Sequence, residues 1–187
     1  MTQDWRLVNK TELYDIRNDK AQTKDVSEDH PKVVAELQAA YETWWADASK
    51  RTGEVEPMFV GETLGTDAVL TAHDWHAKKV PWDQSVIKQA PMLEGHWEIL
   101  ATTGGRYRIT LRQQPTEANF SIVGTRARLA LKGSRGTVKL EQPIKPGAQF
   151  IEFETDIPKG RYQLSASFDQ ISGQTRGAYY AYVRRIQ

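Results

Sequence analysis

The protein has 187 residues, of which 39% are hydrophobic and 26% are charged, and its formal net charge is +1 at pH 7. This balance is ordinary for a globular protein and excludes the strongly basic character of nucleic-acid-binding domains. The chain contains no cysteine, which excludes disulfides, thiolate catalysis and cysteine-ligated zinc. No apolar run approaches the roughly 18 residues of a membrane-spanning helix, so we expect neither a nucleic acid nor a membrane as partner.

The charge is unevenly distributed along the chain. Residues 1–56 contain eight Lys and Arg against twelve Asp and Glu, whereas residues 57–187 contain seventeen against twelve. Hydrophobic periodicity changes at the same point, from helical spacing to short alternating runs broken by Gly, Pro, Asn and Ser. The sequence therefore predicts two domains, 1–56 and 57–187.

The first domain is predicted to be a short hairpin and one long helix. Strands are expected at Trp5–Val8 and Glu12–Asp15, with a turn at 9–11 and a polar loop at 17–30. The helix is expected to start at Asp29 or Pro31 and to stop near Gly53. Spacings of three and four place one apolar stripe along it, formed by Val33, Val34, Leu37, Ala40, Tyr41, Trp44, Trp45 and Ala48. Such a stripe must be buried against the hairpin, the second domain or a partner chain.

The second domain is predicted to be an antiparallel, jelly-roll-like β-sandwich, which gives the whole chain an α+β fold class. The expected strands are 67–72, 96–101, 106–112, 122–132, 136–141, 149–155, 160–168 and 177–185. Thr103-Gly104-Gly105 and Pro158-Lys159-Gly160 have the composition of tight hairpin turns.

Several segments of the first domain, in this order, resemble the C-terminal end of sulfatases. They are Trp5-Arg6-Leu7-Val8-Asn9, Glu12-Leu13-Tyr14-Asp15-Ile16, Asp19, His30-Pro31-Lys32-Val33-Val34 and Trp44-Trp45. The chain departs from the family pattern where Lys20 replaces a proline, Gln22 replaces a glutamate, and Asp25-Val26 stands in place of Asn-Leu. Further segments, Asp74-Trp75, Gly95–Glu98, Gly105–Arg112 and Pro115, resemble the β-rich extension that follows the catalytic core in bacterial arylsulfatase-like proteins.

The resemblance implies a non-catalytic piece that supports or targets a sulfatase catalytic domain lying upstream. The family matures a Cys or Ser two positions before a proline to formylglycine, and none of the eight prolines here has such a residue. The calcium-binding acids of the family lie in the upstream domain as well. We therefore expect no catalytic residue and no cofactor in this chain, with calcium confined to the upstream domain, and a periplasmic or secreted parent protein.

Two basic rows are the main candidates for a binding function. Arg106, Arg108 and Arg112 alternate with apolar residues in one predicted strand, and Arg126, Arg128 and Lys132 do so in another. If both runs are strands, each points an apolar face to the core and a basic face to water. The basic faces could attract a sulfated glycan, or cross-strand acids such as Glu98, Glu152 and Glu154 could neutralise them.

Aromatic and histidine residues between 73 and 95 suggest two other functions. Trp75 and Trp82 could be exposed platforms for a neutral sugar, although tryptophans in such places are usually core residues. His73 and His76 are weak candidates for a metal site, because on a strand they would point to opposite faces. The sequence thus leaves three hypotheses: a sulfatase accessory piece, a carbohydrate-binding module for sulfated or neutral glycans, and a small His-dependent metalloenzyme.

Overall fold

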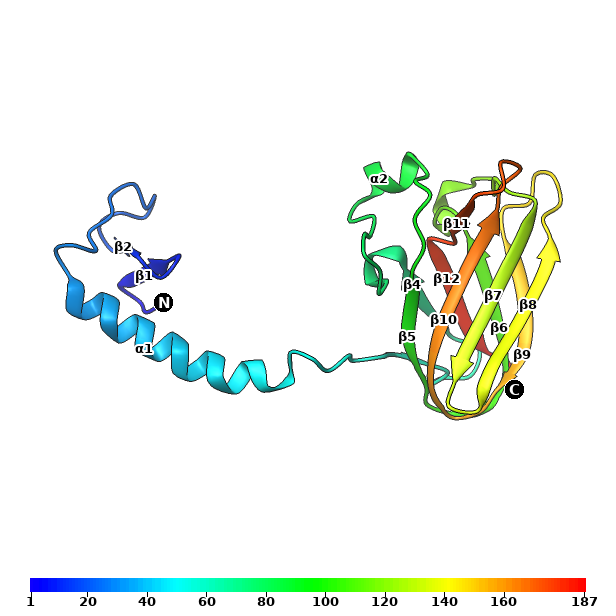
Figure 1. The fold of residues 1–187 in the computed structure, drawn as a ribbon, viewed down its shortest axis with the longest axis horizontal. Coiled ribbons are helices and arrows are strands. Elements are labelled where there is room, and N and C mark those ends of the chain that lie inside the picture. Colours follow the sequence, from blue (N-terminus) through cyan, green and yellow to red (C-terminus); the bar gives the residue numbers. More distant parts are fainter. The chain divides into compact units, whose positions relative to one another are not determined.

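The computed structural model of the protein describes residues 1–187, which form two compact units, Met1–Glu54 and Val55–Gln187 (Figure 1). The first unit holds strands β1 and β2 and the long helix α1. The second unit holds strands β3 to β12 and the short helix α2. Neither helix combines the length and the apolar character that crossing a membrane requires.

The hairpin of the first unit has the predicted bounds. Strands β1 (Trp5–Val8) and β2 (Glu12–Asp15) pair antiparallel, with Trp5 opposite Asp15. Asn9 and Lys10 in the turn have φ angles of 51° and 66°. Two successive residues with positive φ match the right-handed twist of a tight hairpin, because this backbone geometry does not splay the two strands.

Helix α1 spans Pro31–Ala48, with Pro31 in its first turn as predicted. A 3₁₀ turn at Ser49–Arg51 follows, with Thr52 as its C-cap, so the helical run ends next to the predicted stop at Gly53. The N-cap residue is His30, whose side chain makes no capping hydrogen bond, and Asp29 therefore does not cap the helix. The last turn of a helix often tightens into a 3₁₀ turn, which is the case here.

Two carboxylates shape the loop between β2 and α1. Asp25 accepts hydrogen bonds from the backbone N–H groups of Leu13 and Ser27, both at 2.9 Å. Asp19 accepts from the N–H groups of Thr23 at 2.7 Å and of Lys24 at 2.8 Å. The hydrogen bond from Lys24 lowers the pKa of Asp19, and the one from Leu13 lowers that of Asp25. Asp19 and Asp25 therefore both have a structural role in this loop.

Only the first half of α1 is covered within its unit. Gln38 donates a 2.7 Å hydrogen bond from its amide to the backbone carbonyl of Lys10 in the hairpin turn. Further along the helix, Tyr41, Trp44 and Trp45 are exposed and their rings contact one another. The Lys10 ammonium of the hairpin turn lies 5.3 Å from the ring centre of Tyr41. The predicted stripe thus packs on the hairpin at one end and remains uncovered within the unit at the other.

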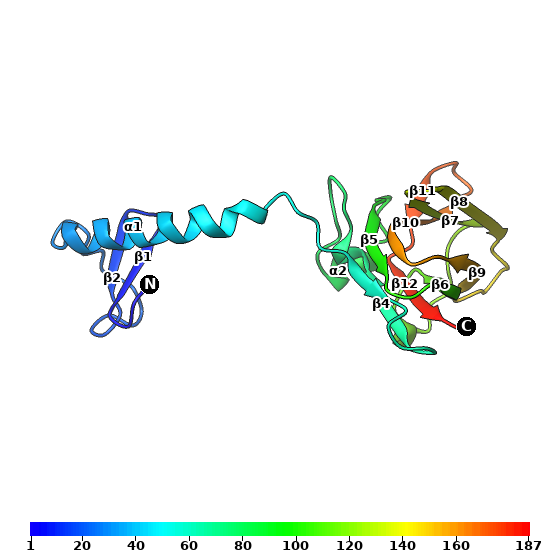
Figure 2. The same ribbon diagram turned by 90° about the horizontal axis from the view of Figure 1, so that it is seen from below.

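The second unit is a sandwich of two sheets (Figures 1 and 2). One sheet has the order β3-β5-β10-β7-β8, with β11 paired to β10, and the other has the order β4-β12-β6-β9. All pairs are antiparallel except β3 with β5. The strands are β3 (Met58–Val60), β4 (Asp67–Thr71), β5 (His96–Ala101), β6 (Gly105–Arg112), β7 (Arg126–Gly133), β8 (Gly136–Pro143), β9 (Ile151–Ile157), β10 (Gly160–Asp169), β11 (Thr175–Gly177) and β12 (Tyr180–Arg185).

Each predicted strand is present, but three details of the prediction are wrong. Strand β3 was not predicted, and the run 177–185 is split between β11 and β12. The glycine-containing links at 103–105 and 158–160 are not hairpin turns, because they join β5 to β6 and β9 to β10, which lie in different sheets. A short glycine-rich link shows that the chain reverses direction, but it does not show whether the next strand pairs or crosses over.

The alternating apolar residues of both sheets form one core between them. Tyr107, Ile109 and Leu111 of β6 are fully buried, as are Trp97 of β5 and Leu164 of β10. The Trp97 indole N–H donates a 2.6 Å hydrogen bond to the backbone carbonyl of Thr71. This contact satisfies the polar atom of the largest buried side chain and links β5 to the end of β4 in the opposite sheet.

Candidate functional site

The two predicted basic rows lie on opposite faces of the sandwich. Arg106 and Arg108 belong to β6 in the four-stranded sheet, whereas Arg126, Arg128 and Lys132 belong to β7 in the other sheet. In both strands the residues between them are buried, so the predicted alternation is confirmed. The rows nevertheless do not combine into one basic surface, because their strands face away from each other across the core.

Carboxylates on neighbouring strands neutralise most of these charges. Four arginines form ion pairs, namely Arg108 with Glu154 at 2.9 Å, Arg126 with Glu141 at 2.7 Å, Arg128 with Asp169 at 2.8 Å and Arg106 with Asp156 at 3.4 Å. Lys132 makes no ion pair. Exposed pairs of this kind add little stability, typically about 0–1 kcal/mol, but they remove the excess positive charge that would attract a polyanion.

Arg112 does not belong to a water-facing row. Its side chain is only 7% exposed, and its guanidinium carbon lies 5.8 Å from the ring centre of Phe150. Its Nε atom has no hydrogen-bond partner within the chain. The sequence pattern placed it with Arg106 and Arg108, but Arg112 is the last residue of β6 and its guanidinium lies against Phe150.

Trp75 is a core residue and not an exposed platform. It is 5% exposed, and its ring centre lies 5.8 Å from those of Trp97 and Tyr179. A Cβ atom on Gly95 or Gly177 would lie 2.7 or 2.5 Å from the Trp75 side chain. The two glycines therefore leave room for the indole, and no ring face remains free for a ligand.

Trp82 has the opposite environment. It is 70% exposed, although the ring of His73 meets it edge-on at 4.8 Å between ring centres. Beside it lies a hollow of about 360 Å³, here called the Trp82 hollow. Its lining consists of Thr71, His73, Pro81, Trp82, Asp83, Gln84, Ile87 and Tyr180.

Helix α2 (Gln84–Lys88) holds the rim of the Trp82 hollow in place. Asp83 caps this helix through one carboxylate oxygen, Oδ1, which accepts from the Ser85 hydroxyl at 2.6 Å and from the Val86 N–H at 3.0 Å. The hydrogen bond from Ser85 makes the largest contribution to lowering the pKa of Asp83, so the carboxyl is ionised at neutral pH. Gln84 donates a 2.5 Å hydrogen bond to the Tyr180 hydroxyl and so ties α2 to β12.

The groups around the hollow retain hydrogen-bonding capacity. Asp83 keeps its Oδ2 atom free of hydrogen bonds within the chain, and Gln84 uses only its amide nitrogen. The Tyr180 hydroxyl accepts from Gln84 and can still donate its own proton. The arrangement therefore offers a flat apolar ring face together with acceptors and a donor, which suits a ligand with both C–H and O–H surfaces.

The two candidate metal ligands do not converge. His73 lies in a 3₁₀ turn at Ala72–Asp74 against Trp82, whereas the ring of His76 stacks on that of His96 at 5.5 Å between centres. No group of three His, Asp or Glu side chains in the chain is arranged to hold a metal ion. The geometry therefore gives no support to the metalloenzyme hypothesis.

Sequence reasoning identified Trp82 and His73 but missed Gln84 and Tyr180. These two residues are 96 positions apart in the sequence and meet only because β12 lies beside β4. No local pattern marks such a pair. Asp83 carries a readable signal, since an aspartate before a short apolar run is a common helix cap.

Comparison with known proteins gives neighbours by structure alone, since no family model and no curated sequence matches the chain. A ruminal GH26 endo-β-1,4-mannanase shares 11% identity and a TM-score of 0.42, covering 67% of this chain and 27% of the mannanase. A family 35 carbohydrate-binding module from Clostridium thermocellum shares 14% identity and a TM-score of 0.40, covering 65% of this chain and 99% of the module. A third neighbour, the flagellar hook-capping protein FlgD from Xanthomonas campestris, shares 13% identity and a TM-score of 0.34, covering 55% of this chain and 78% of FlgD.

Family 35 carbohydrate-binding modules occur repeatedly among the structural neighbours. This chain spans about a quarter of the mannanase and nearly the whole of the C. thermocellum module. At such low identities and TM-scores, and with a flagellar protein among the neighbours, the likeness does not establish a shared function. By its own strand order, the protein is an α+β chain whose larger part is a jelly-roll-like β-sandwich.

Proposed function

We propose that residues 55–187 form a carbohydrate-binding module that holds a sugar ring in the Trp82 hollow. The observation that carries this proposal is the exposure of Trp82, which keeps 70% of its surface accessible while hydrogen-bonding side chains surround it. A large aromatic ring is costly to leave in water, and a sugar can cover it with its C–H face.

The ring of Trp82 is held ready for such a ligand. Its edge contact with His73 restricts the side chain, so binding loses little of its rotational freedom. Sugar hydroxyls at the rim of the ring can donate to the Oδ2 atom of Asp83 and accept from the hydroxyl of Tyr180. The combination of one stacking face with a few convergent polar groups is typical of small-ligand sites.

The charges of the sandwich favour a neutral glycan over a sulfated one. The arginines that would bind sulfate groups are held by carboxylates on both faces, as with Arg108 and Glu154. The hollow itself contains the ionised Asp83, which repels sulfate. We therefore expect dextran sulfate to be retained no better than dextran on immobilised protein at physiological salt.

The test is calorimetric titration of the full chain with a panel of neutral oligosaccharides, for the intact protein and for Trp82→Ala. We expect the intact protein to bind a neutral oligosaccharide and Trp82→Ala to bind it with at least tenfold lower affinity. Trp44→Ala is the matched control, because Trp44 is also exposed but lies in the first unit. Equal affinity of Trp82→Ala and the intact protein would refute the site, and no binding to any glycan would refute the function.

A second candidate function concerns the first unit. We propose that α1 docks onto a sulfatase-type catalytic domain, as the sequence resemblance of residues 4–49 implies. The uncovered aromatic residues Tyr41, Trp44 and Trp45 support this, since such a cluster is normally buried by a partner.

This second proposal is tested by co-sedimentation with a sulfatase catalytic domain that lacks its own C-terminal hairpin and helix. We expect association that is lost when both Trp44 and Trp45 are changed to Ser. The chain by itself should hydrolyse arylsulfates no faster than buffer. Failure to associate, or equal association of the double variant, would count against a sulfatase partner and leave the sugar-binding proposal untouched.

A further inference from the structure

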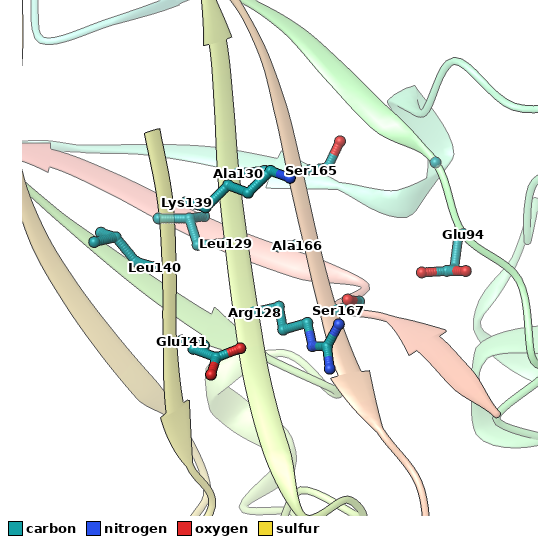
Figure 3. A pocket seen from close by; sticks show the side chains of 11 residues that line it. Glu94, Arg128, Leu129, Ala130, Lys139, Leu140, Glu141, Ser165, Ala166 and Ser167 are labelled. Atoms are coloured by element: carbon teal, nitrogen blue, oxygen red, sulfur yellow. The ribbon is translucent and has the colours of Figure 1, made fainter. Parts of the chain in front are cut away.

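The outer face of the six-stranded sheet contains a further hollow, away from Trp82. It measures about 430 Å³ and lies across β10, β7 and β8, with Glu94 at one side (Figure 3). Its floor consists of Ala130, Ser165 and Ser167, whose side chains are small. A depression forms here because flanking positions carry long side chains, including Arg128 and Lys139.

The register of the strands explains this floor. Ala130 of β7 pairs with Ser165 of β10, and Arg128 of β7 pairs with Ser167. Alternate residues point to the same face of a sheet, so these four side chains form two adjacent rows on the outer surface. In Figure 3, Lys139 extends from β8 across β7 toward Ser165, and Arg128 extends toward Ser167.

The polar groups of this hollow are largely unused within the protein. Lys139, Glu94, Ser165 and Ser167 make no side-chain hydrogen bond or ion pair with the rest of the chain, whereas Arg128 is held by Asp169. The hollow thus offers a free ammonium, a free carboxylate and two free hydroxyls. Lys139 repels a purely cationic ligand, and Glu94 repels a purely anionic one. An uncharged, hydroxyl-rich ligand therefore suits the hollow best.

A second hollow of about 280 Å³ lies further along the same two strands. It is lined by Lys132, Gln163 and Glu98, which stand opposite one another on β7, β10 and β5 in the next outward row. From Gln163 to Ser167 the strand rises by roughly 13 Å at about 3.3 Å per residue. The two hollows, here together called the sheet trough, span the length of a short oligosaccharide.

We propose that the sheet trough is a second glycan-binding site, which takes an extended stretch of a neutral polysaccharide along β7 and β10. The inference rests on the proposed function and deepens it, because it assigns chain binding to the trough and single-ring binding to the Trp82 hollow. The two sites lie in the same compact unit, so a polysaccharide that reaches both binds more tightly than either site alone allows.

The experiment compares the affinity of the full chain for a neutral methyl glycoside with its affinity for tetrasaccharides of β-1,4-linked glucose, mannose and xylose. Ser165→Arg places a long side chain on the exposed floor, and Ser172→Arg in the exposed turn after β10 is the matched control. We expect Ser165→Arg to lower tetrasaccharide affinity at least tenfold and to leave glycoside affinity unchanged. Lys139→Ala, which removes an exposed side chain without adding bulk, should lower tetrasaccharide affinity about threefold or more.

The proposal that the sheet trough binds glycan is overturned if Ser165→Arg and Lys139→Ala both bind the tetrasaccharide as tightly as the intact protein does. Equal affinity of the intact protein for glycoside and tetrasaccharide would overturn it as well. Neither result affects the proposed function, which fails only if the intact chain binds no glycan or if Trp82→Ala has no effect. If Trp82→Ala still binds the tetrasaccharide, and adding Ser165→Arg to this variant abolishes the binding, the two sites are separate.

Discussion

The contrast between Trp75 and Trp82 gives the sharpest prediction. The two tryptophans lie seven positions apart, but one is 5% exposed and the other 70% exposed. Trp75→Ala leaves a large cavity, and the cost of such a truncation is typically 3–5 kcal/mol. For a unit of this size that corresponds to a melting temperature lower by roughly 10–20 °C. Trp82→Ala removes an exposed ring and should change stability by no more than about 0.5 kcal/mol.

Binding should show the reverse order. An aromatic side chain buries about 150–250 Å² when fully covered, so one ring face under a sugar removes on the order of 80 Å² from water. At about 25 cal/mol per Å² this gives roughly 2 kcal/mol, or about a 30-fold loss of affinity in Trp82→Ala.

Differential scanning calorimetry and glycan titration of the two variants provide the assays. Acrylamide quenching of tryptophan fluorescence gives an independent check. The accessible fraction should be smaller in Trp82→Ala than in the intact protein, because only Trp44 and Trp45 remain as strongly exposed tryptophans. If Trp82→Ala lowers the melting temperature as much as Trp75→Ala does, Trp82 belongs to the core and the platform argument is refuted.

Three further predictions concern stability. Gly61→Ala should lower the free energy of unfolding by about 2 kcal/mol or more, because Gly61 has φ +76° and an added Cβ would overlap the hydroxyl of the buried Tyr107. Gly173→Ala, at φ +83° in open space, should lower it by only about 1–2 kcal/mol. Equal losses in urea unfolding would contradict this prediction. Burial raises the pKa of Tyr179 to about 12 from its ordinary 10.0, so its contribution to stability is full below pH 10 and is lost as pH rises toward 12. The urea midpoint should therefore decline less steeply between pH 10 and pH 12 in Tyr179→Phe than in the intact protein. An equally steep decline would argue against a raised pKa of Tyr179. The exposed pair of Arg108 and Glu154 should show a coupling energy below about 1 kcal/mol in a double-mutant cycle, and a larger value would mean that the pair is structurally important.

The first unit shows how far local patterns reach. The hairpin bounds at Trp5–Val8 and Glu12–Asp15 and the start of α1 at Pro31 were predicted correctly. These elements depend on residues close together in the sequence, namely a short turn and a proline in the first helical turn. The surface that buries the apolar stripe could not be predicted, because it depends on which elements pack against α1 in the folded protein.

The basic rows show where alternation stops being informative. Alternation correctly predicted which side of each strand is buried, since that depends on spacing within a single strand. It could not predict that β6 and β7 belong to different sheets. It offered Glu154 of β9 as a neutralising acid, which the ion pair with Arg108 confirms, but it did not identify Glu141 and Asp169 as the partners of Arg126 and Arg128. Strand pairing joins segments distant in the sequence, so the charge of a face is decided only when the sheets form.

The same limit applied to both candidate sites. The sequence by itself determined the strands, the alternation, the long helix and the presence of an isolated tryptophan at position 82. Only the tertiary structure decided that Trp75 is buried while Trp82 is exposed, and that Gln84 meets Tyr180. The sheet trough depends likewise on small residues of β7 and β10 lying opposite one another. Local backbone preferences act over a few residues, whereas a binding surface requires side chains that only long-range packing brings together.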